Sequence, residues 1–103
     1  MRIDKNFKPG LTPPSNSSPA PGMYKVVALK DTQTPEFFMA AIIVELFGVP
    51  KASARLLARQ IHKKGNVCLG AFSHEIAEIK TDLANDISRH EGHPLTFVSK
   101  LMK

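Results

Sequence analysis

The segment Ile61–Lys80, IHKKGNVCLGAFSHEIAEIK, decides the fold because it holds two helix boundaries around a short apolar strand. Gly65 suits the left-handed position just after a helix end, and Ser73 suits an N-cap whose hydroxyl accepts backbone N–H groups. Between them, residues Val67–Leu69 form a continuous apolar run. Such a run predicts a strand that is buried on both faces, and therefore the central strand of a sheet.

The length and composition of the chain indicate one soluble globular domain. The chain has 103 residues, of which 43% are hydrophobic and 22% are charged. A net charge of +5 favours an acidic partner, and nucleic acid is one such class. A single cysteine excludes an internal disulfide. No secretory or membrane-spanning segment is recognisable, so we expect a cytoplasmic protein.

Proline and serine dominate the first 22 residues. This stretch holds five of the eight prolines, together with serine, asparagine and glycine. It has too little apolar surface to offset the entropy lost on ordering, so residues 1–22 are predicted to be a disordered arm. The folded core is predicted to cover residues 23–103.

Hydrophobic periodicity and helix-boundary residues predict six elements in the core. Thr34 is expected to be the N-cap of the first helix, and Pro35 its first residue. The expected elements are strand 24–29, helix 35–47, helix 50–64, strand 67–69, helix 74–91 and strand 95–101. This order predicts an α+β domain of β-α-α-β-α-β topology, in which a three-stranded antiparallel sheet carries three helices on one side.

The second and third helices are predicted to be amphipathic. Helix 50–64 has an apolar stripe opposite a basic row: Ala54, Leu57, Ala58 and Ile61 against Lys51, Arg55, Arg59 and Lys63. Helix 74–91 is expected to turn its large aliphatic residues inward and its acidic residues outward: Ile76, Ile79, Leu83 and Ile87 against Glu75, Glu78, Asp82 and Asp86. The basic row could contact phosphates, but without neighbouring aromatic residues a solvated face is the better interpretation.

The sequence does not predict an enzyme, a cofactor or a metal site. His90 and His93 flank a helix-ending glycine, and no further ligands have the spacing of a zinc site. Cys68 is expected to lie inside a buried strand, which would make its thiol inert. Glycine-rich phosphate loops and hydrolase motifs are absent from the sequence.

His62 and Asp31 are the best candidates for a functional site. His62 falls at a helix C-terminus, where a histidine can simply interact favourably with the helix dipole. Asp31 falls in the loop after the first strand, next to the start of the first helix. If the first two strands are neighbours, the carboxylate and the imidazole could line one small cavity. The residues alone leave both interpretations open.

Three segments resemble the ClpS adaptors of the ATP-dependent Clp protease. They are MYKVVALKDTQTPEFF from Met23, QIHKKGNVCLGAFSHEIAEIK from Gln60 and HEGHPL from His90. The resemblance runs without a gap from Met23 to about Leu95. It implies a non-enzymatic adaptor that binds substrates through a large hydrophobic N-terminal residue and delivers them to the AAA+ unfoldase ClpA or ClpC.

The resemblance also implies roles for particular residues. Those that would bind the substrate α-amine are Lys30, Asp31, Thr32 and His62. Those that would line or gate the side-chain pocket are Thr34, Glu36, Ala58, Ile61 and Leu95. Those that would dock on the unfoldase are Glu75 and Lys80.

Several of these positions depart from the family pattern. The family's Asn-Asp-Asp loop reads Lys30-Asp31-Thr32 here, and two pocket methionines are replaced by Glu36 and Ala58. An ammonium at Lys30 would repel the substrate amine by up to about 4 kcal/mol at ~4 Å and an effective dielectric of about 20. We therefore expect altered N-terminal recognition. The alternatives are a regulator that docks on the unfoldase without binding N-terminal residues, and a small basic RNA-binding module.

Overall fold

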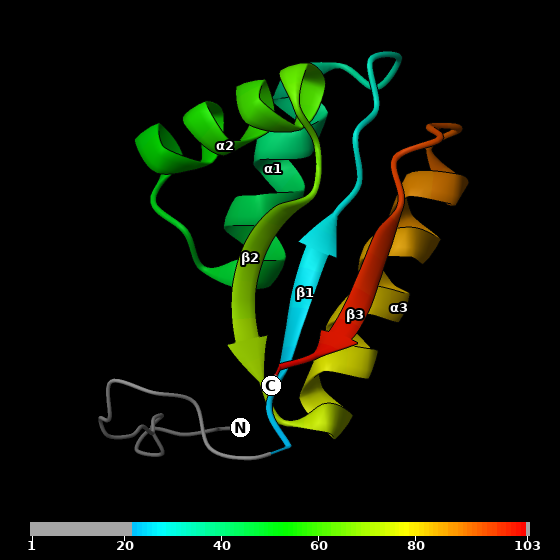
Figure 1. Ribbon diagram of the computed structural model, residues 1–103. Helices are drawn as coiled ribbons and strands as arrows, with labels where there is room; N and C mark the ends of the chain where they lie inside the picture. Colours follow the sequence, from blue (N-terminus) through cyan, green and yellow to red (C-terminus); the bar gives the residue numbers. More distant parts are fainter. Residues whose placement is uncertain (1–21, 103) are drawn as a thin grey trace.

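The computed structural model describes residues 22–102 (Figure 1). Its elements are β1 (Tyr24–Ala28), α1 (Glu36–Phe47), α2 (Lys51–Lys63), β2 (Val67–Phe72), α3 (His74–His90) and β3 (Phe97–Leu101). The predicted α+β class and element order are confirmed. The predicted disordered arm lies outside the described residues apart from Gly22, so the arm and the domain boundary stay predictions.

The sheet has the order β2-β1-β3, and both outer strands are antiparallel to β1. The central strand is therefore β1, and the prediction that the strand beginning at Val67 is central was wrong. In β2, Val67 and Leu69 are buried whereas Cys68 between them is exposed. Because successive strand side chains point to opposite faces, Cys68 lies on the outer face of an edge strand. The expectation of a buried thiol was therefore also wrong.

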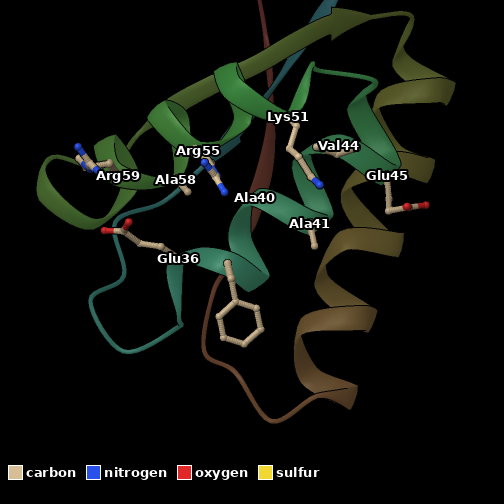
Figure 2. A pocket seen from close by; sticks show the side chains of 10 residues that line it. Glu36, Ala40, Ala41, Val44, Glu45, Lys51, Arg55, Ala58 and Arg59 are labelled. Carbon is tan, nitrogen blue, oxygen red and sulfur yellow. The ribbon is translucent and has the colours of Figure 1, made fainter.

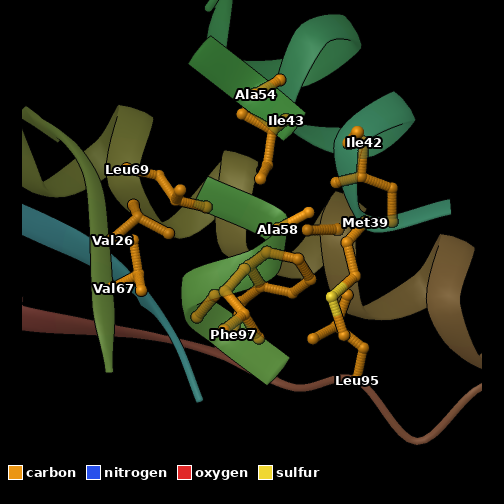
Figure 3. Packing of buried hydrophobic residues seen from close by; sticks show 14 of the residues in the cluster. Val26, Met39, Ile42, Ile43, Ala54, Ala58, Val67, Leu69, Leu95 and Phe97 are labelled. Carbon is orange, nitrogen blue, oxygen red and sulfur yellow. The ribbon is translucent and has the colours of Figure 1, made fainter. Parts of the chain in front are cut away.

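The three helices pack on one side of the sheet, as predicted (Figure 1). The core between the layers contains Phe97 of β3 with Met39 and Ile43 of α1 (Figure 3), together with Ile61 of α2. Each of these side chains is at most 2% exposed. Burying a side chain of this size contributes about 1.5–3 kcal/mol to the free energy of unfolding. Within residues 22–102, every helix is too short or too polar to cross a membrane.

The helix boundaries follow local chemistry. The hydroxyl of Ser73 accepts a hydrogen bond from the backbone N–H of Ile76 at 3.3 Å, so the predicted N-cap of α3 is confirmed. Gly65 follows α2 with φ of 74°, in the left-handed region that favours glycine. The N-cap of α1 is Pro35 rather than Thr34, because the hydroxyl of Thr34 donates to Asp31 instead of capping the helix.

α3 buries a different face from the one predicted. Its large aliphatic residues are exposed: Ile76 42%, Ile79 49%, Leu83 46% and Ile87 36%. Its buried residues are small: Ala77, Thr81, Ala84 and Ser88. Small side chains let a helix lie close to the sheet, and this close packing outweighs the preference of isoleucine for the interior. In α2, by contrast, three of the four predicted core residues, Ala54, Ala58 and Ile61, are fully buried, and the fourth, Leu57, is partly buried.

Candidate functional site

The loop between β1 and α1 is organised by the carboxylate of Asp31. Its Oδ1 accepts a hydrogen bond from the backbone N–H of Gln33 at 2.9 Å, and its Oδ2 accepts one from the hydroxyl of Thr34. An aspartate that binds the backbone two residues ahead forms an Asx turn, which fixes the chain reversal. The Asp31 carboxylate is therefore held in one position by the loop that it shapes.

His62 lies near the end of α2 and reaches the same loop. Its Nε2–H donates to the carbonyl oxygen of Thr34 at 2.7 Å, and its Nδ1 lies 3.3 Å from Oε2 of Glu36. Asp31 contacts the hydroxyl of Thr34 while His62 contacts the carbonyl, so both side chains meet at one residue. The structure thus brings together Asp31 and His62, the two residues that the sequence singled out.

Gly65 fixes the distance between this loop and the end of α2. A Cβ on Gly65 would overlap the Cα and Cβ of Lys30, so the two backbones touch where a side chain would not fit. The close approach requires glycine for its missing side chain as well as for its positive φ. The Lys30 and Thr32 side chains are exposed at the rim of the loop.

A cavity of about 530 Å³ opens between α1 and α2, beside Glu36 (Figure 2). Its floor is made by the small buried residues Ala40 and Ala58, and the exposed Ala41 also lines it. Its charged rim has carboxylates on α1 and cations on α2: Glu36 and Glu45 against Lys51, Arg55 and Arg59. The cavity is therefore apolar at its base and carries opposite charges on its two walls.

The predicted side-chain pocket is only partly reproduced by this cavity. Glu36 and Ala58 line it, whereas Thr34, Ile61 and Leu95 are at most 3% exposed and belong to the interior. The cationic wall was not included in the predicted site. The four-residue spacing of Lys51, Arg55 and Arg59 was its signal in the sequence, but this row was interpreted as a solvated face.

The two predicted docking residues on α3 have different surroundings. Glu75 is exposed in the first turn. Lys80 is half-buried: its Nζ donates to the carbonyl oxygen of Leu46 at 2.6 Å and lies over the rings of Phe47 and Phe72. Burial lowers the pKa of Lys80 below its usual 10.5. Lys80 therefore satisfies a carbonyl at the end of α1, whatever else it contacts.

Proteins of one known family are similar to this chain in sequence. A family model described as ATP-dependent Clp protease adaptor protein ClpS matches residues 19–98. The ClpS adapter proteins of Ruegeria pomeroyi, Roseobacter denitrificans and Salmonella arizonae are 43%, 39% and 30% identical to the chain. These matches cover 73%, 82% and 90% of the chain. They span 66%, 75% and 81% of the three relatives' own lengths.

A solved structure shares the fold. It is that of Agrobacterium tumefaciens ClpS2 bound to L-phenylalaninamide, which has 28% sequence identity to the chain and superposes with a TM-score of 0.76. The match covers 81% of the chain and all of the ClpS2 chain. The family name describes an adaptor rather than an enzyme, in agreement with the sequence expectation. The chain belongs to the ClpS family of ATP-dependent Clp protease adaptor proteins.

Proposed function

We propose that this protein is a cytoplasmic, non-enzymatic adaptor that binds substrate proteins by their free N-terminus and delivers them to ClpA or ClpC. The observation that carries the proposal is the meeting of Asp31 and His62 at Thr34, with Glu36 on the other side of the imidazole. The Asp31 carboxylate and the imidazole thus border one short stretch of backbone, while Glu36 lines the adjacent α1–α2 cavity. Glu75 and Lys80 of α3 are the proposed contacts to the unfoldase.

The chemistry of a free N-terminus fits these groups. An α-amine is largely protonated at neutral pH and has three N–H donors, and carboxylates are its strongest acceptors. L-phenylalaninamide, the ligand of the related ClpS2, has a free α-amine next to a large hydrophobic side chain. That likeness supports an N-terminal residue as the substrate group of this chain as well.

We further propose that the N-terminal specificity is altered. The side chain of Glu36 is 42% exposed at the edge of the cavity, and a hydrophobic substrate side chain placed over its carboxylate would have to displace the water bound there. Lys30 adds a positive charge to the loop that would receive a positive amine. Both changes weaken the binding of hydrophobic N-termini, and Glu36 favours a polar or cationic residue instead.

Fluorescence anisotropy with labelled peptides tests the proposal. Peptides beginning with Phe, Leu, Tyr, Trp or Arg are compared with the same peptides acetylated at the α-amine. We expect binding that requires the free amine, with weak affinity for the hydrophobic set. Micromolar or tighter binding of ordinary hydrophobic N-termini would contradict altered specificity. Equal binding of free and acetylated peptides would contradict recognition of the N-terminus.

One observation favours a second function, that of a regulator which docks on the unfoldase without binding N-termini. Both oxygens of Asp31 and both ring nitrogens of His62 already have partners inside the protein. A substrate amine would have to share or displace these partners. Competition with a standard ClpS for the unfoldase, together with no binding of any peptide in the panel, would identify the regulator.

A further inference from the structure

The exposed aliphatic residues of α3 form a continuous stripe on the surface. Ile76, Ile79, Leu83 and Ile87 follow one another at intervals of three or four residues, so they lie along one side of the helix for about 16 Å. They are 36–49% exposed. Aliphatic side chains aligned on one surface helix indicate a contact with another segment. We call these four residues the α3 stripe.

An acidic row runs beside the α3 stripe. Each stripe residue is immediately preceded in the sequence by an acidic residue: Glu75, Glu78, Asp82 and Asp86. A step of one residue rotates by about 100° around a helix of 3.6 residues per turn, so the row borders one flank of the stripe. Asp86 is paired with Arg89 at 2.5 Å, and Glu78 lies 3.2 Å from His74. The row as a whole remains negative, and the surface suits a segment that is both apolar and basic.

We propose that the occupant of the α3 stripe is this chain's own N-terminal segment, residues 1–11. The segment reads MRIDKNFKPGL, with Ile3, Phe7 and Leu11 spaced by four residues. It has three basic residues, Arg2, Lys5 and Lys8, against the single acidic Asp4. Its composition therefore complements the stripe in hydrophobicity and the acidic row in charge.

The place where this segment joins the domain supports the same pairing. Tyr24 pairs with Phe72 in the sheet, and its ring lies 4.4 Å from that of His74, the first residue of α3. The 21 residues before Gly22 can span up to about 70 Å when extended, several times the length of the stripe. A segment tethered next to the helix has a millimolar effective concentration at its surface.

Charge argues against a second copy of the chain as the occupant. Two copies joined through α3 would bring the same acidic row of each into the interface, and like charges in an interface oppose association. The contact does not depend on peptide binding at Asp31 and His62, because the loop from Lys30 to Pro35 lies at the opposite end of the sheet from the start of α3 (Figure 1). Glu75 is shared between the acidic row and the proposed unfoldase contacts, so the bound segment would lie against that surface.

Paramagnetic NMR on the full chain tests the contact. The exposed Cys68 is replaced by serine, and a spin label is attached to Asn6→Cys. We expect the label to broaden the methyl signals of Ile79 and Leu83. The matched control is Leu56, which is 61% exposed on α2 and should keep a sharp signal. The triple substitution Arg2→Glu, Lys5→Glu and Lys8→Glu should abolish the broadening.

Three outcomes would overturn the proposal. The first is a spectrum in which the stripe methyl groups are no broader than those of Leu56. The second is broadening that survives the triple charge reversal unchanged. The third is broadening that grows with protein concentration while sedimentation shows a dimer, which would assign the stripe to a second copy. Peptide binding at the Asp31–His62 site is measured separately, so its failure is distinguishable from failure of this contact.

Discussion

Nδ1 of His62 lies 3.3 Å from the carboxylate of Glu36, while Nε2 of the same ring lies 2.7 Å from the carbonyl oxygen of Thr34. The imidazole near the end of α2 is thus held between the first residue of α1 and the loop before it. Glu36 places its negative charge at a helix N-terminus, where the helix dipole stabilises it. When His62 is protonated, the two side chains form an ion pair at the edge of the cavity.

Replacing Glu36 should restore binding of hydrophobic N-termini. Glu36→Met removes a carboxylate that a hydrophobic side chain would have to desolvate, and we expect about tenfold tighter binding of a peptide beginning with Phe, or roughly 1.4 kcal/mol. Adding Lys30→Asn should increase the gain. The matched control is Glu45→Met, at the other end of the cavity on the same helix. Unchanged anisotropy titrations with the double variant would contradict the assignment of the pocket.

Substitutions of Asp31 should separate its structural role from its charge. Asp31→Ala loses both hydrogen bonds of the turn, and we expect the free energy of unfolding to fall by about 1–3 kcal/mol. Asp31→Asn keeps one oxygen acceptor and should cost less stability, yet it removes the negative charge that an amine would bind. The two variants should therefore bind peptides with similar affinity in anisotropy titrations but differ in stability in urea denaturation.

Alanine at Gly65 should be far more harmful than alanine at Gly48. Both glycines have positive φ, 74° and 66°, and so share the left-handed cost of about 1–2 kcal/mol. A Cβ on Gly48 meets nothing within 4 Å, whereas one on Gly65 would overlap Lys30. We expect Gly65→Ala to lose at least ~2 kcal/mol more than Gly48→Ala in urea denaturation. Equal losses would show that the loop moves aside without cost.

The two faces of α3 should respond in opposite ways to substitution. Ala84 is fully buried, so Ala84→Leu overfills the space against the sheet and should cost about 1–3 kcal/mol of unfolding free energy. Leu83, its neighbour, is 46% exposed, and Leu83→Gln should change stability by less than about 1 kcal/mol. If thermal denaturation reversed this order, the face of α3 that packs on the sheet would have to be reassigned.

Lys80 should make stability rise at alkaline pH. Burial lowers its pKa in the folded protein below 10.5, so between the lowered value and 10.5 the unfolded chain holds a proton that the folded protein has released. More protons bound to the unfolded chain mean that the free energy of unfolding increases with pH in this window. Lys80→Met lacks this contribution, so the free energy of unfolding of the wild type should increase relative to that of the variant as pH rises. A constant difference across the window would contradict the pKa direction.

The sequence predicted those parts of the fold that depend on local chemistry. Glycine is favoured just after a helix end and serine at a helix N-cap, so Gly65 and Ser73 were assigned correctly. The choice between faces depends on packing, which a single sequence does not reveal. Val67–Leu69 lies on an edge strand although it is continuously apolar, and Ile79 is exposed because alanines pack closer to the sheet.

The candidate site was predictable only through residues of unusual chemistry. Asp31 and His62 stood out as a charged loop residue and a helix-end histidine, and both contact Thr34. The contact between His62 and Glu36 joins residues 26 positions apart, and no periodicity in the sequence predicts such a pair. The α1–α2 cavity depends on how two helices pack, so its cationic wall emerged only from the structure.

β1 is made first, yet it lies between two strands that are made later. While only β1, α1 and α2 have left the ribosome, neither edge of β1 has a strand to pair with. Pairing over such long sequence separations is slow because a large loop must close before any contact forms. In the nascent chain, one edge of this apolar strand therefore stays unpaired until β2 has been translated, and the other edge until Phe97–Leu101 has followed.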